Sequence, residues 1–124
     1  MIRSLDLFPD YITLGEILRK LGEDCRAERE SFTMAASTTP ISSGTEGEVL
    51  SALERVLPGI AGAVKDLPGV IGVRAAIHRG TLFGRPDELL IAIAAEKGEE
   101  AASALEEAFS RYRENVPARG VTHR

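Results

Sequence analysis

The sequence predicts a single α+β domain of two layers, spanning residues 1–124, in which helices pack on a mostly antiparallel sheet. Two kinds of pattern carry this prediction. Thr13-x-x-Glu16 and Thr45-x-x-Glu48 are capping boxes that mark helix starts. Leu89 to Ala95 is a nearly continuous apolar run, which is typical of a strand buried on both faces. The resulting order is strand, helix, strand, helix, strand, strand, helix.

The N-terminal part of the chain predicts two strands around one helix. Met1 to Leu7 has the apolar members of a short strand. The helix that starts at the first capping box is expected to end at Gly22, because glycine often terminates helices. Glu23 to Glu30 then reads as a charged connection, and Ser31 to Ala36 as a strand. Ser37 to Gly44, rich in Ser, Thr, Pro and Gly, is expected to be a loop.

The rest of the chain predicts two helices and a pair of strands. One set of apolar residues has the spacing of an amphipathic helix: Val49, Leu50, Leu53, Val56 and Leu57. Pro58-Gly59 is expected to kink or end this helix, which leaves a second helical piece beyond it. The elements that follow are a strand at Val70–His78, a loop at Arg79–Asp87, the apolar strand, and a helix that begins after Glu96 and ends near Asn115.

Composition excludes several classes of function. The net charge of −4 does not favour general nucleic-acid binding. Cys25 is the only cysteine, so no intrachain disulfide or cysteine metal site is expected; we interpret it as a surface or half-buried thiol. His78 and His123 lie far apart in sequence, so we expect no histidine metal cluster. No cofactor is expected. Without an apolar leader or a membrane-length apolar run, a cytoplasmic protein is expected.

A few basic residues are candidates for an anion-binding site. His78-Arg79 ends a predicted strand, and the pair is either a half-buried histidine beside a solvated arginine or an anion-binding edge. Arg111 and Arg113 lie in the last turn of the final helix, where cations are favoured in any case. They point about 200° apart, so only one of them can face a shared pocket.

The stretch from Ile77 to Pro117 resembles the C-terminal half of the catalytic, large subunit of molybdopterin synthase. The matching elements are Ala76-Ile77-His78-Arg79, the turn exit and strand at Asp87–Ala95, the helix start at Glu100-Ala101-Ala102 and the helix end at Asn115-Val116-Pro117. From His78 to Gly120 the match needs no gap and covers about 43 of the 124 residues.

The resemblance implies a sulfurtransferase activity. The family enzyme converts a cyclic pyranopterin precursor, a pterin phosphate, into dithiolene-bearing molybdopterin. Its sulfur arrives as a thiocarboxylate on the Gly-Gly tail of a small ubiquitin-like partner. On this resemblance Arg113 takes the position of a catalytic lysine, while Arg79, Lys97, Arg119 and His78 are expected to bind substrate or other anions. The resemblance also implies that Arg79, Lys97 and Arg113 surround one pocket. Family large subunits pair, and a sheet of few strands leaves open edges, so we expect a homodimer.

The chain departs from the family at its lysines. The first falls on Arg113 and the second on Gly120, and the family's His-Arg pair after the buried strand falls on Lys97-Gly98. Arginine does not act as a base at neutral pH. Three interpretations therefore stay open: a divergent enzyme, a non-catalytic binding or regulatory relative, and an unrelated ferredoxin-like dimerisation module.

Overall fold

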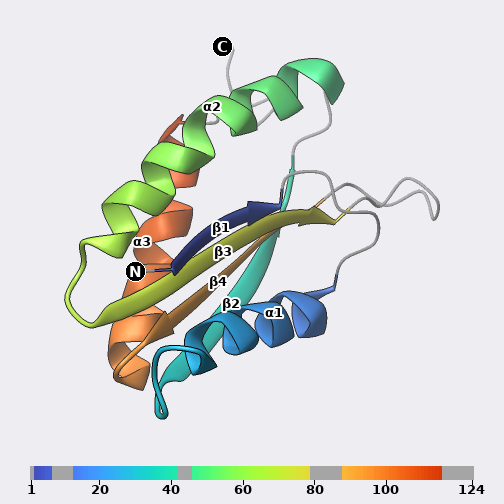
Figure 1. Cartoon of the computed structure of the whole chain (residues 1–124). Coiled ribbons are helices and arrows are strands. Elements are labelled where there is room, and N and C mark those ends of the chain that lie inside the picture. The colour runs from blue at the N-terminus through green and yellow to red at the C-terminus, as the bar shows by residue number, and fades with distance from the viewer. Residues whose placement is uncertain (1, 7–12, 42–45, 79–87, 116–124) are drawn as a thin grey trace.

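The computed structural model describes residues 2–6, 13–41, 46–78 and 88–115, with the backbone alone in 2–6 and 46–54. Seven elements follow in the predicted order (Figure 1). They are β1 (Ile2–Asp6), α1 (Leu14–Arg26), β2 (Thr33–Pro40), α2 (Glu46–Lys65), β3 (Val70–His78), β4 (Glu88–Ala95) and α3 (Gly98–Asn115). The loop predicted at Arg79–Asp87 lies outside the described residues.

The four strands form one sheet in the order β1-β3-β4-β2. The pairs β3–β4 and β2–β4 are antiparallel, whereas β1 joins the edge parallel to β3. The α+β class with a mostly antiparallel sheet is therefore confirmed. The structure adds a layer to the prediction, because α1 covers one face of the sheet and α2 with α3 cover the other (Figure 1).

Strand β4 separates the two halves of the core. Its odd-numbered residues, such as Ile91, pack with α2 and α3, and its even-numbered residues, such as Leu90, pack with α1. Every residue from Leu89 to Ala95 is at most 2% exposed. This double burial explains why the segment is apolar throughout and does not alternate with polar residues.

Helix α1 is longer than predicted. Its capping box is present: the Thr13 hydroxyl accepts a hydrogen bond from the Glu16 N–H, and the Glu16 carboxylate accepts one from the Thr13 N–H. The expectation that Gly22 ends the helix is wrong, because the helix continues to Arg26. Cys25 lies one turn beyond Leu21 in the same buried stripe, so packing against the sheet continues past the glycine.

Two further boundaries differ from the prediction. The expected loop at Ser37–Gly44 is strand as far as Pro40, since these residues pair with β4 up to Glu88; residues 42–45 lie outside the described part. Proline is tolerated at the end of this edge strand. Helix α2 also continues through Pro58, so no separate second piece exists. A stripe of buried residues flanks the proline: Leu57, Ile60, Ala61 and Val64.

Gly69 turns the chain from α2 into β3. Its φ is +79°, the left-handed region that side chains other than glycine rarely adopt. The Glu100 carboxylate of α3 lies directly against its Cα, where a Cβ would stand. The same carboxylate accepts a hydrogen bond of 3.1 Å from the Lys97 N–H at the start of α3. The turn at Gly69, with the Glu100 carboxylate packed against it, therefore positions both the beginning of β3 and the beginning of α3.

Candidate functional site

His78 ends β3 directly opposite Glu88, the first residue of β4. Its half-buried side chain lines a cavity of about 200 Å³ on the α1 face of the sheet. The other lining residues come from the start of α1 and from β2 and β4: Thr13, Leu14, Thr38, Glu88 and Leu90. An imidazole, a carboxylate and two hydroxyls thus share one small cavity.

The Thr38 hydroxyl makes this cavity chemically unusual. Within the described residues, its oxygen is the single buried side-chain polar atom without a hydrogen-bond partner. Leaving a buried hydroxyl unsatisfied costs about 1–3 kcal/mol. The cavity therefore suits a water molecule or a small polar group. The sequence did not point to Thr38 or Glu88, because their proximity to His78 depends on strand register.

Arg113 lies in the last turn of α3 with an exposed side chain. Among the described residues it makes no ion pair, in contrast to Arg111, whose Nε lies 2.8 Å from Glu107 Oε2. Tyr112 lies between them in sequence and packs into the core, where burial raises the pKa of its hydroxyl. The two arginines therefore diverge around a buried tyrosine, as the helical spacing predicts.

Lys97 immediately precedes α3 and is exposed. Arg113 lies 16 positions after Lys97, which corresponds to roughly 24 Å along the helix. One phosphate group cannot bridge that distance, so the expectation that both residues surround one pocket is wrong within a single chain. His78 is also separated from Arg113, because its cavity lies on the α1 face whereas α3 packs on the other face. Anion binding by each residue separately stays a prediction, and Arg79 and Arg119 lie outside the described residues.

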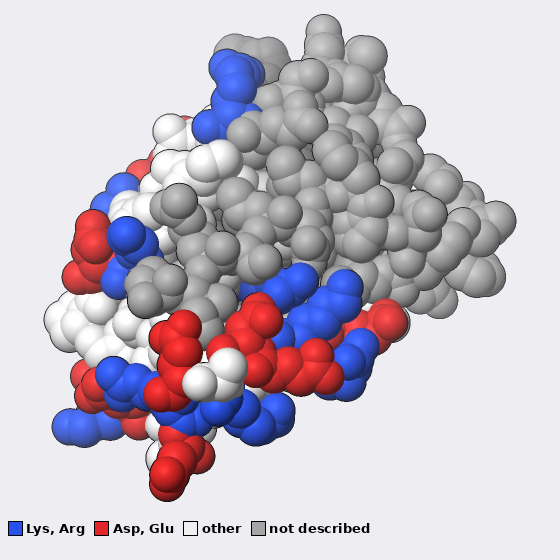
Figure 2. Space-filling view, in the orientation of Figure 1, with Lys and Arg blue, Asp and Glu red and all other residues white. Residues whose placement is uncertain are grey.

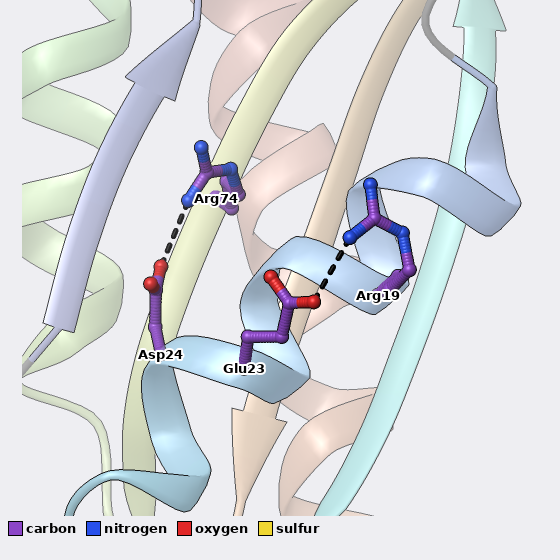
Figure 3. Close-up of polar contacts among 4 residues, drawn as sticks. All are labelled: Arg19, Glu23, Asp24 and Arg74. Carbon is purple, nitrogen blue, oxygen red and sulfur yellow. Dashed lines mark hydrogen bonds and ion pairs between the residues drawn. The ribbon is translucent and has the colours of Figure 1, made fainter.

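The surface around α1 carries both signs of charge. Acidic and basic side chains are interspersed over this helix (Figure 2). Arg19 pairs with Glu23 at 2.9 Å along the helix, and Asp24 pairs with Arg74 of β3 at 2.8 Å (Figure 3). The Arg74–Asp24 pair connects α1 to the sheet. These contacts are structural, and they do not form a basic surface for an anionic partner.

The described part of the chain has no group of three or more His, Cys, Asp and Glu side chains that could hold a metal ion. None of the described helices is long and apolar enough to cross a membrane.

Cys25 is fully buried against the sheet, where a surface or half-buried thiol was expected. Burial raises its pKa above the usual value of about 9, and Asp24 and Glu28 raise it further. The thiol therefore stays protonated at neutral pH and is shielded from reagents.

We expect iodoacetamide to alkylate Cys25 in the folded protein at pH 7.5 at least about 100-fold more slowly than in urea. Mass spectrometry against time measures the modification. Equal rates with and without urea would contradict the burial of this residue.

The same burial makes the stability of the protein depend on pH. Above pH 9 the unfolded chain loses the thiol proton first, so the free energy of unfolding should fall as the pH rises through this range.

Comparison with known proteins identifies the fold. No family model and no curated protein sequence matches the chain. Among solved structures, "Molybdopterin cofactor biosynthesis protein E" from Burkholderia multivorans ATCC 17616 superimposes with a TM-score of 0.69 at 15% identity, covering 94% of this chain and 80% of that one. The chain has the fold of this molybdopterin biosynthesis protein.

Two further structures agree with this molybdopterin biosynthesis fold. The molybdopterin biosynthesis MoaE protein from Burkholderia ambifaria MC40-6 gives a TM-score of 0.62 at 16% identity, covering 91% of this chain and 77% of that one. A complex of subunits 1 and 2 of molybdopterin-converting factor from Helicobacter pylori 26695 gives a TM-score of 0.60 at 15% identity, covering 91% of this chain and 80% of that one. The resemblance to the molybdopterin synthase large subunit is thus confirmed for the fold. All three matches are in fold, at 15–16% identity.

Proposed function

We propose that this chain acts in molybdenum cofactor biosynthesis as a large-subunit-type partner that binds a small ubiquitin-like sulfur carrier by its Gly-Gly tail. The observation that carries the proposal is agreement in fold over nearly the whole chain with molybdopterin biosynthesis proteins. One of the similar structures is a complex of subunits 1 and 2 of molybdopterin-converting factor, which supports a second, different subunit as the partner.

Arg113 determines which chemistry we propose. A guanidinium stays protonated at neutral pH and holds a carboxylate or phosphate with two parallel hydrogen bonds. It does not act as a base or as a nucleophilic amine, the chemistry that the resemblance assigns to a lysine at this position. Binding of the carrier tail is therefore the better-supported function, with Arg113 as an anion-binding residue.

Sulfur transfer to the cyclic pyranopterin precursor is a second candidate. It is favoured by the exposed positive charge of Arg113, which makes no ion pair within the described residues and so is free to neutralise a thiocarboxylate or phosphate. The two candidates differ in what they produce: sulfur transfer yields a dithiolene product, whereas binding alone yields only the complex.

The test is a single-turnover reaction of the protein with thiocarboxylated carrier and precursor, in which complex and dithiolene product are measured in the same sample. We expect a complex without product, and about tenfold weaker binding after Arg113→Ala. Arg113→Lys should keep the complex, and product from this variant would support descent from the enzyme. Arg19→Ala, which removes an exposed arginine on α1, is the control and should bind as the unmodified chain does.

Product from the unmodified chain would favour the second candidate. The absence of both the complex and the product would contradict both candidate functions.

A homodimer in the cytoplasm remains part of this proposal. Strands β1 and β2 lie at the two edges of the sheet, and each is paired on one side only among the described strands. An open edge is a common surface for pairing with a second chain.

A further inference from the structure

A groove between α2 and α3 has a lining that the proposed function does not use. Its volume is about 350 Å³, within the usual range of small-molecule sites. On each helix the lining residues stand about one turn apart, and two of them, Val56 and Ile60, are apolar. The lining consists of Arg55, Val56, Gly59, Ile60, Arg111 and Asn115.

The charge of this groove is positive. Arg55 and Arg111 contribute two guanidinium groups from different helices, and none of the lining residues that the structure describes carries a carboxylate; Glu107, which pairs with Arg111 at 2.8 Å, offsets part of this charge. By contrast, the groove beside Gly69 is lined by Glu99 and Glu100, and the cavity at His78 contains Glu88. Among these three hollows of the described surface, the one between α2 and α3 is the one suited to an anion.

Local contacts prepare Arg111 for a ligand. Glu107, one turn earlier, accepts a hydrogen bond of 2.8 Å from Arg111 Nε, and this contact leaves the two terminal nitrogens of the guanidinium for another partner. Asn115 donates its side-chain N–H to the Arg111 carbonyl oxygen at 2.8 Å. This bond satisfies one of the carbonyls that make the end of a helix unfavourable for anions.

Gly59 leaves the groove open. A Cβ at this position would meet nothing within 4 Å, so the space beside Arg55 is empty. The lining also includes Ile60, which is buried, and Val56, which is partly buried. The groove therefore offers two charged groups beside an apolar surface, an arrangement that fits a phosphate attached to an apolar or planar body.

We propose that the groove between α2 and α3 binds a small phosphate monoester, with Arg55 and Arg111 holding the phosphate. Paired guanidinium groups match the geometry of phosphate oxygens. The site is distinct from Arg113, and it stands whether or not the chain binds a sulfur carrier.

The test is an NMR titration of the ¹⁵N-labelled protein with phenyl phosphate, inorganic phosphate and phenol. We expect saturable shifts at Gly59, Asn115 and Arg111 Nε with phenyl phosphate, at a Kd on the order of 1 mM. Inorganic phosphate should bind more weakly at the same residues, and phenol should produce no saturable shift. These three probes separate the contribution of the charge from that of the apolar body.

Variants decide whether the groove is the site. Arg55→Ala and Arg111→Ala should each weaken phenyl phosphate binding about tenfold. Gly59→Leu should fill the groove and abolish binding while the helix remains intact. Arg19→Ala, on α1 across the sheet, should leave the affinity unchanged. Absence of saturation up to about 10 mM, phenol binding as tightly as phenyl phosphate, or full affinity in Gly59→Leu would each overturn the proposal.

Discussion

Replacing Ile91 by alanine is expected to destabilise the fold by roughly 3 kcal/mol, and Leu90→Ala by a similar amount. Both residues lie on β4, which is paired on both sides, and they are 1% and 2% exposed. Ile91 packs under α2 and α3, whereas Leu90 packs under α1. Each substitution leaves a cavity in a different layer of the core.

This pair of variants tests the three-layer arrangement directly. Urea unfolding followed by circular dichroism gives both free energies, and Ile91→Val, expected to cost roughly 1 kcal/mol, is the conservative control. In a domain of two layers Leu90 would face solvent, and its truncation would cost well under 1 kcal/mol. A small effect at Leu90 beside a large one at Ile91 would contradict the packing of α1 on the sheet.

Gly69→Ala is expected to destabilise the protein by roughly 2–3 kcal/mol, a sum of two costs. A side chain at φ +79° costs about 1–2 kcal/mol, and displacing Glu100 from the start of α3 costs about 1 kcal/mol more. The added Cβ would collide with the Glu100 carboxylate, which must then release the Lys97 N–H. Unfolding in urea measures the loss.

Gly59→Ala is the matched control for Gly69→Ala. Gly59 lies inside α2 with open space at its Cβ position, so alanine should stabilise the helix by up to about 1 kcal/mol. Opposite signs for the two substitutions are the expected result. A loss at both positions would contradict the open space beside Gly59, and a neutral Gly69→Ala would contradict the turn geometry.

The order of elements was predictable because each strand and helix has a strong local pattern. The boundaries that were wrong share a physical cause, since tertiary packing outweighed a local stop signal. Gly22 does not end α1 because Cys25 extends the buried stripe beyond it. Pro58 does not end α2, where a proline costs about 3 kcal/mol, because buried residues on both sides hold the helix on the sheet.

Strand β2 illustrates the limit of composition as a guide. Ser37 to Pro40 has the residues of a loop, yet it pairs with β4 through Glu88 as an edge strand. Thr38 consequently lies beside His78 in a shared cavity. Strand register decides this proximity, and local pattern does not encode which residue of one strand faces which residue of another.

The site was less predictable than the fold. The resemblance led to the fold that the solved structures confirm. It also suggested that Lys97 and Arg113 share one pocket, but α3 holds them at its opposite ends. The groove between α2 and α3 was not predicted, because Arg55 and Arg111 lie on two different helices and only their packing brings them together.

The proposed function requires that this chain binds a ubiquitin-like sulfur carrier through the carrier's tail. Isothermal titration calorimetry with the intact carrier and with a carrier lacking its terminal Gly-Gly tests it most directly. We expect saturable binding of the intact carrier, one per chain, and at least about tenfold weaker binding of the shortened carrier, because the tail is the anion that Arg113 would hold. Equal affinity for the two carriers, or no binding of either, would contradict it.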